Sequence, residues 1–199
     1  MEFNDVIKKR RSVRRFNDRK PDPEVVDRVI DQARRAPTAG FSQGVDFLML
    51  DDPAALDAFW ELIEDPQFPS DEEERATRPP LLVLVWSDPQ RYVARYSAPD
   101  KIEFGMDDPD AWPVRFWDVD AGMASMQLQL AAVNEGIDTW FFGIPYGEDA
   151  VRERFGVPAD RNQVGVIALG YRHDGEQPAS SVIKRRRRAL EEQLHRNGW

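Results

Sequence analysis

Residues 81–86 read LLVLVW, and this stretch decides the fold class. A run of six apolar residues is far too short to cross a bilayer, which takes about 20 residues. A short, continuously apolar run is typical of a strand covered on both of its faces. We therefore expect residues 81–86 to form the central strand of a sheet whose two faces are buried.

The flanking sequence supplies the other elements. We predict further strands at residues 45–50, 139–144 and 164–171 from their apolar, β-rich composition. We predict helices at residues 3–11, 23–35, 53–63, 88–96 and 114–135, and the last of these is the most apolar and should be central. Residues 64–80 and 98–117 are expected to be loop or lid segments. A charged helix or arm is expected at 186–197, within a C-terminal arm of 186–199. No linker or repeat divides residues 1–199, so we expect a single domain.

Composition restricts the chemistry. The chain has 199 residues, a net charge of −9 and no cysteine. The missing cysteine excludes disulfides, thiolate nucleophiles, iron–sulfur clusters and thiolate zinc sites. With only two histidines and no H-E-x-x-H motif, we expect no metal site. The first residues lack an apolar secretion signal, and we expect a cytoplasmic protein without membrane spans.

Residues 40–44, GFSQG, satisfy the pattern G-x-S-x-G of the α/β-hydrolase nucleophile. That serine follows a strand and precedes a helix, whereas Ser42 follows a predicted helix and precedes a predicted strand. The two histidines, His173 and His195, lie in a strand-end loop and a charged tail. We therefore reject a catalytic triad and expect Ser42 to be a hydrogen-bonding or turn residue.

Two cationic patches stand out in this acidic chain. Six of the eight residues at 8–15 are basic, and residues 184–188 are an unbroken basic run. If the chain is extended at the first patch, Arg10, Ser12 and Arg14 point to one side and could bind a phosphate together. Arg185 and Arg187 show the same alternation. The alternatives are ordinary helix-end charges or a nucleic-acid surface, and the net charge of −9 argues against nucleic acid.

Several motifs in a fixed order resemble the FMN-dependent nitroreductase family. They are RRSVRRF at 10–16, APTAGFSQ at 36–43, DVDAGMASMQLQLAAVNE at 118–135, GIDTWFFGIP at 136–145, RFGVP at 154–158, VIALGY at 166–171 and RRRRALEE at 185–192. The resemblance spans nearly the whole chain. It implies an α+β fold with a central mixed or antiparallel sheet flanked by helices. It also implies an interlocked homodimer that binds FMN at the subunit interface.

The resemblance also implies site residues. Arg10, Ser12 and Arg14, joined by Arg185 and Arg187, would hold the FMN phosphate, and Arg11 would contact phosphate or ribityl. Thr38, Ala39, Gly40 and Ser42 of the partner subunit would line the flavin, where Gly40 and Gly44 would let the backbone approach a flat ligand. Gln127 would face the flavin, and the backbone at Phe141, Phe142 and Gly143 would face its pyrimidine edge and N5.

Some of these residues have a second interpretation. Gln127 could instead serve a helix–helix contact, and Phe141 and Phe142 could be core strand residues. Trp112, Phe116 and Trp117 could cap a substrate channel or belong to the core. Phe41 replaces an asparagine found in many relatives, and Gly44-Val45 replaces their Pro-Trp, so Phe41 could stack on the flavin or fill part of the channel.

The activity implied by the resemblance is NAD(P)H oxidation coupled to the reduction of flat acceptors such as nitroaromatics and quinones. Hydride would pass through flavin N5 in a ping-pong cycle, so no catalytic protein residue is predicted. The alternative is a flavin-binding or flavin-sequestering protein of the same fold with little turnover.

Overall fold

The stretch LLVLVW forms the strand β2 (Leu81–Ser87), and every residue of it is buried. The computed structural model describes residues 1–177 and 185–199 of the chain. Strands β1 (Val45–Leu50) and β4 (Asn162–Gly170) pair with β2 on either side, and β3 (Asp138–Phe142) pairs with β4. All three pairings are antiparallel, in the order β1-β2-β4-β3. Among the described residues, the parallel component is a single bridge between Ser12 and Thr139.

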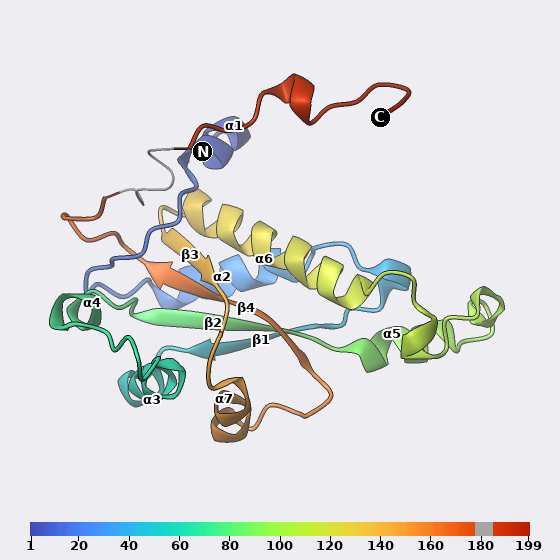
Figure 1. The fold of residues 1–199 in the computed structure, drawn as a ribbon, viewed down its shortest axis with the longest axis horizontal. Helices are drawn as coiled ribbons and strands as arrows, with labels where there is room; N and C mark the ends of the chain where they lie inside the picture. The colour runs from blue at the N-terminus through green and yellow to red at the C-terminus, as the bar shows by residue number, and fades with distance from the viewer. Residues whose placement is uncertain (178–184) are drawn as a thin grey trace.

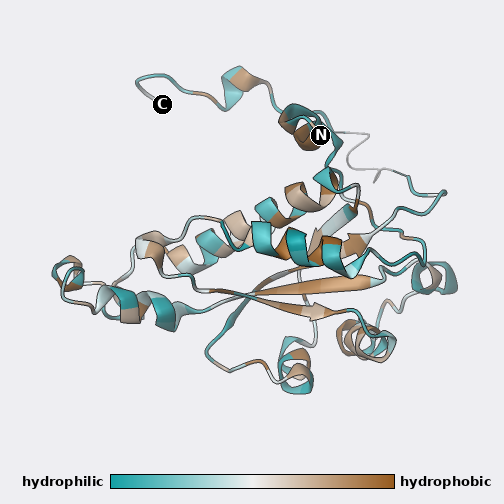
Figure 2. Ribbon diagram, turned by 180° about the vertical axis from the view of Figure 1, so that it is seen from behind, coloured by the Kyte–Doolittle hydropathy of each residue, from teal (hydrophilic) through white to brown (hydrophobic). Residues whose placement is uncertain are grey.

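Alternate residues of β2 face two separate cores. Leu81, Val83 and Val85 pack with α2 (Pro23–Ala33) and α6 (Phe116–Asn134). Leu82, Leu84 and Trp86 pack on the other face with α3 (Pro53–Ile63) and α7 (Glu148–Phe155). Figure 1 shows the sheet between these two helical layers. In Figure 2 the strands are mainly brown, while the helices carry both colours, as amphipathic elements do. The prediction of a central strand buried on both faces is confirmed.

Three helices begin with the same two letters, Asp-Pro. Asp22, Asp52 and Asp88 precede α2, α3 and α5 (Pro89–Tyr96), and each carboxylate accepts a backbone N–H of the first turn. An aspartate at the N-cap satisfies N–H groups that lack a helical partner, and a proline at the next position needs none. The starts of these three helices are therefore encoded locally.

Several predictions of elements need correction. The 64–80 segment contains a short helix, α4 (Glu72–Ala76), with a capping box between Asp71 and Glu74. Helix α7 was not predicted. Of the helix or arm expected at 186–197, the structure shows an arm, with a 3-10 turn at Leu190–Glu192. Residues 98–117 are irregular as expected, with 3-10 turns at Ile102–Phe104 and Pro109–Ala111 before α6 begins.

The chain starts with α1 (Phe3–Lys9), which lies beside the C-terminal end of α6. The amino group of Met1 donates to Asn134 Oδ1 at 3.1 Å and joins the two helices. No helix in the described ranges has the length and apolar character needed to span a membrane.

Candidate functional site

The N-terminal arginine motif is extended, which was the condition set for Arg10, Ser12 and Arg14 to point to one side. After α1 the chain runs along the edge of β3, where Ser12 bridges Thr139 and the Val13 N–H donates to the Thr139 carbonyl at 3.0 Å. Val13 is buried, whereas Ser12 and Arg14 are exposed. The alternation puts the hydroxyl and the Arg14 guanidinium outside the sheet edge, with the apolar residue between them inside the core.

Two of the motif's arginines remain open to a ligand. No ion pair to Arg10 or Arg14 is present in the described part of the chain. Arg14 Nη1 makes only a long 3.4 Å bond to the Ser12 carbonyl, and its guanidinium lies 5.8 Å from the centre of the Trp140 ring. Arg11 differs, because its guanidinium donates to the carbonyls of Lys8 and Arg10 and so caps the end of α1. The side chains of Arg10 and Arg14 therefore remain open, whereas Arg11 turns back toward its own helix.

The second cationic patch is only partly described. Lys184 lies outside the described residues. Arg185 and Arg187 are exposed, and neither makes a side-chain hydrogen bond to another described residue. Figure 1 shows the arm that carries them passing near α1 before it leaves the body of the chain. Both guanidiniums are thus available, although no contact joins them to Arg10 or Arg14.

The loop at residues 38–43 has an unusual backbone. Gly40, Phe41 and Gln43 all have positive φ, at 61°, 58° and 52°. The left-handed region costs a non-glycine residue roughly 1–2 kcal/mol. Ser42 Oγ donates to the Ala39 carbonyl at 2.6 Å, and the Gln43 N–H donates to Thr38 Oγ1 at 3.0 Å. Ser42 is a buried turn residue, which confirms that it is no triad serine.

Contacts within the chain explain why this loop has glycines at positions 40 and 44. A Cβ on Gly40 would lie 2.8 Å from the Tyr96 ring, and a Cβ on Gly44 would lie 2.5 Å from the Tyr92 ring. The close approach that we attributed to a flat ligand is therefore an approach to two tyrosines of α5. The positive φ at position 40 also favours glycine there.

The end of β3 carries residues of two kinds. Phe142 is a core residue that stacks on Trp60 and Trp140, with ring centroids 5.7 and 4.4 Å away. The ring of Phe141 covers Gly165 on the opposite face, where a Cβ would lie 2.3 Å from it. Gly143 is exposed, and a Cβ there would meet nothing within 4 Å. The side chains of Phe141 and Phe142 therefore pack within the chain, and the exposed backbone begins at Gly143.

Two further candidates lie in internal contacts. Gln127 Nε2 donates to the Gln32 carbonyl at 2.6 Å, which ties α6 to the end of α2 and supports the helix–helix interpretation. Trp112 is buried against Tyr92 and Trp117, and its indole N–H donates to the Met106 carbonyl at 2.9 Å. This placement supports the core interpretation for Trp112 and Trp117. Phe116 and Phe41 keep exposed surface.

The loop depends on residues that the sequence analysis missed. Asp120, in the first turns of α6, accepts the Ala39 N–H and the Tyr92 hydroxyl, both at 2.7 Å. Arg95 Nε donates to the Gly40 carbonyl at 3.0 Å. One signal was available: an aspartate within the most apolar helix needs a buried hydrogen-bond partner.

Within one chain, the arginine motif and the loop at residues 38–43 lie at opposite ends of α6. The loop is bonded to Asp120 near the start of α6, and α1 is bonded to Asn134 at its end. Fourteen residues of helix separate these anchors by about 21 Å. Arg14 lines a cavity of about 410 Å³ with Trp60 and Arg78, whereas Thr38 and Gln43 line a different one of about 260 Å³. The predicted site is therefore not assembled within a single chain.

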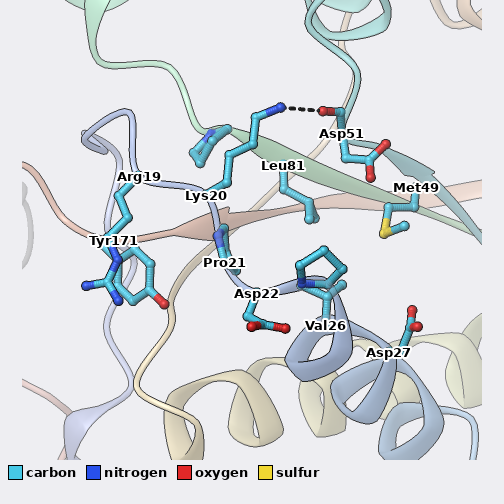
Figure 3. A pocket seen from close by; sticks show the side chains of 12 residues that line it. Arg19, Lys20, Pro21, Asp22, Val26, Asp27, Met49, Asp51, Leu81 and Tyr171 are labelled. Atoms are coloured by element: carbon cyan, nitrogen blue, oxygen red, sulfur yellow. Dashed lines mark hydrogen bonds between the residues drawn. The ribbon is translucent and has the colours of Figure 1, made fainter.

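A larger cavity, of about 620 Å³, lies at the start of α2 and includes none of the predicted residues. Figure 3 shows Lys20 reaching Asp51, whose carbonyl accepts from Lys20 Nζ at 2.9 Å, and Arg19 beside Tyr171. The Arg19 guanidinium lies 4.2 Å from the centre of the Tyr171 ring. Asp22 is occupied as the cap of α2. Lys20 and Asp22 are therefore engaged in holding the turn before α2.

Comparison with known proteins gives a consistent family. Residues 7–171 match the model of the Nitroreductase family. A protein of Methanothermobacter thermautotrophicus, provisionally named NADH dehydrogenase/NAD(P)H nitroreductase, is 26% identical over 86% of this chain and 78% of its own length.

Solved structures agree on the fold. A provisionally named nitroreductase from Exiguobacterium sibiricum, solved in complex with FMN, superposes with a TM-score of 0.72 at 22% identity, covering 98% of this chain and 97% of its own. An FMN-dependent nitroreductase from Clostridium difficile superposes with a TM-score of 0.69 at 19% identity, covering 98% of each chain.

Proposed function

The chain belongs to the nitroreductase family, and we propose that it is an FMN-dependent NAD(P)H oxidoreductase that reduces flat acceptors such as nitroaromatics and quinones. The observation that carries the proposal is the extended motif at the edge of β3, with its open guanidiniums and hydroxyl. The FMN of the Exiguobacterium relative and the cofactor named for the Clostridium relative support the choice of ligand.

The residues present fit FMN by their chemistry. Arg10 and Arg14 offer forked cationic donors, and Ser12 offers a hydroxyl between them, which suits a phosphate dianion. Arg185 and Arg187, exposed on the C-terminal arm, can add further positive charge. At the other end of the site, the open backbone at Gly143 leaves room for a flat ring to approach.

When bound, FMN would supply hydride chemistry between NAD(P)H and the acceptor, with the two substrates using one pocket in turn. This chain's residues would bind, orient and stabilise charge. Backbone N–H groups at Phe142 and Gly143 would stabilise negative charge on the reduced ring without moving a proton. Such a site needs no catalytic acid or base.

We propose further that the active protein is a homodimer. The arginine motif and the loop at 38–43 lie at opposite ends of α6, so a second copy is needed to bring one chain's motif to the other's loop. The outer face of α6 supports this arrangement, because Val119, Met123 and Met126 are each at least 40% exposed. Monomeric proteins seldom expose a contiguous apolar surface of this kind.

Replacing both Arg10 and Arg14 with alanine should remove FMN from the protein. Each charge-assisted hydrogen bond contributes about 1.5–3 kcal/mol, so losing two arginines should weaken FMN binding at least 100-fold. The measurement is the flavin absorbance retained after gel filtration. Arg28→Ala is the matched control, because Arg28 is an exposed arginine of α2 that pairs with Glu135 at 3.4 Å. Full flavin retention in the double variant would overturn the phosphate-site assignment.

The alternative function, flavin binding with little turnover, gains some support from Phe41. This residue is 77% exposed on a fixed loop, so it can cover a flavin held by a second copy. Anaerobic addition of NADH or NADPH separates the two functions. Bleaching of the flavin followed by recovery with a quinone supports the enzyme, whereas persistent flavin absorbance supports the binding protein.

A further inference from the structure

A buried carboxylate holds the loop at residues 38–43. Asp120 is only 1% exposed, and one of its oxygens, Oδ2, accepts both the Ala39 N–H and the Tyr92 hydroxyl at 2.7 Å. No ion pair to Asp120 is found within residues 1–177 and 185–199. Because an unpaired buried carboxylate is costly, these two donors are what make its position favourable.

Tyr92 is suited to remain a donor. Its burial, together with its hydrogen bond to Asp120, raises the pKa of Tyr92 well above its ordinary value. The hydroxyl therefore stays protonated in any ordinary buffer. The Tyr92 ring also fills the space beside Gly44 at the end of the loop, while the hydroxyl reaches the loop only through Asp120.

Arg95 adds a second point of attachment. Its Nε donates to the Gly40 carbonyl at 3.0 Å, and its two terminal nitrogens donate to Asp100 at 2.9 and 2.7 Å. The paired carboxylate raises the pKa of Arg95, and the guanidinium lowers the pKa of Asp100. Arg95 is thus fixed by Asp100 while it holds the loop.

These contacts maintain a strained backbone. Phe41 and Gln43 are non-glycine residues with positive φ, a conformation that persists only where the surroundings enforce it and that often marks functional positions. The result is a phenylalanine whose side chain is 77% exposed although its backbone is fixed. On a loop that only faces solvent, a large exposed apolar side chain held in this way contributes nothing to the stability of the fold.

We propose that Asp120, Tyr92 and Arg95 form a clamp that preorganises the loop and presents Phe41 to the flavin pocket of a second copy of this chain, where Phe41 controls acceptor binding. This inference rests on the proposed function. Asp120, Tyr92 and Arg95 are positioning residues and act through Phe41. The occupant is a second copy because the loop that carries Phe41 is bonded to Asp120 near the start of α6, the helix with the exposed apolar residues Val119, Met123 and Met126 of the proposed dimer face.

A double-mutant cycle in the FMN-loaded protein tests the clamp. Tyr92→Phe removes one hydroxyl and should raise the acceptor KM about fivefold, as expected for the loss of one hydrogen bond. In a Phe41→Ala background the same change should alter KM less than twofold, because the clamp then has nothing to position. Tyr96→Phe is the control, since the ring of Tyr96 packs on Gly40 and its hydroxyl makes no side-chain hydrogen bond to another described residue.

Two further measurements distinguish a failure of the clamp from a failure of the proposed function. The flavin of the wild-type protein should be reduced anaerobically by NAD(P)H, and amide exchange at Ala39 should accelerate in Tyr92→Phe. Additive effects of the two substitutions, with normal flavin reduction, would overturn the clamp and leave the proposed function intact. A wild-type protein that takes up no FMN would overturn both.

Discussion

At the scale of single residues, Gly143 and Gly165 are glycines for different reasons. Gly165 is required by the fold, since a Cβ there would lie 2.3 Å from the Phe141 ring. Gly143 has no such contact, and its backbone does not need the left-handed region. The described residues therefore leave Gly143 unexplained, and the approach of a flat ligand provides an explanation.

Gly143→Ala should separate binding from stability. An alanine at an open position with ordinary φ should change the free energy of unfolding by less than about 0.5 kcal/mol. If FMN lies close to this backbone, the added methyl should weaken FMN binding about tenfold or more. Thermal unfolding of the apoprotein and FMN titration measure the two quantities. Unchanged FMN affinity would mean that the ring lies elsewhere.

Single residues also show the limit of sequence patterns. The alternation at Arg10, Ser12 and Arg14 was readable because an extended chain has a period of two. The glycines at 40 and 44 were readable as close approaches, but the sequence could not say that the approaching groups are Tyr96 and Tyr92. Such partners are far apart in sequence and are fixed only by tertiary packing.

At the scale of elements, local signals located some helices and left others undetected. The strand at residues 45–50 and the helix at 53–63 have the predicted bounds. Helix α7 buries only Val151, so its apolar periodicity is weak. The available signal was the pair of flanking glycines, Gly147 and Gly156, with acidic residues in the first turn and basic residues in the last. Both glycines are left-handed in the structure.

At the C-terminal arm the sequence left helix and arm open, and the structure shows an arm. Its sequence contains good helix formers, yet Leu190 is 67% exposed and Leu194 also lies open. A short helix without a packing surface is unstable in water. Within the described residues the arm therefore has no packing surface that would stabilise a helix.

The central strand should tolerate truncation least. Leu84 is fully buried in β2, so Leu84→Ala should cost about 2–5 kcal/mol in free energy of unfolding. Met49 on the edge strand β1 is partly exposed, so Met49→Ala should cost less than about 1 kcal/mol. Urea titrations of both variants provide the comparison. Equal losses would contradict the placement of β2 at the centre of the sheet.

At the scale of the whole molecule, the two predicted parts of the site lie apart in a single chain. One chain carries the arginine motif at one end of α6 and the clamped loop at the other. Motif order along the sequence pointed to both parts, but no sequence pattern could show that their anchors on α6, Asn134 and Asp120, are about 21 Å apart in a single copy. That separation makes the oligomeric state a condition for the proposed activity.

Breaking the apolar face of α6 should therefore abolish both dimerisation and FMN binding. Val119 and Met126 are two helical turns apart on this face and are 44% and 46% exposed. Because both are exposed in the single chain, Val119→Glu with Met126→Glu should leave the fold intact, as circular dichroism would check. In a dimer interface, two buried unpaired carboxylates cost several kcal/mol. Sedimentation at micromolar concentration should then give a monomer without flavin.

Phe68→Glu, at an exposed apolar residue outside α6, is the control and should remain a yellow dimer. A double variant that stays dimeric would place the interface on another surface.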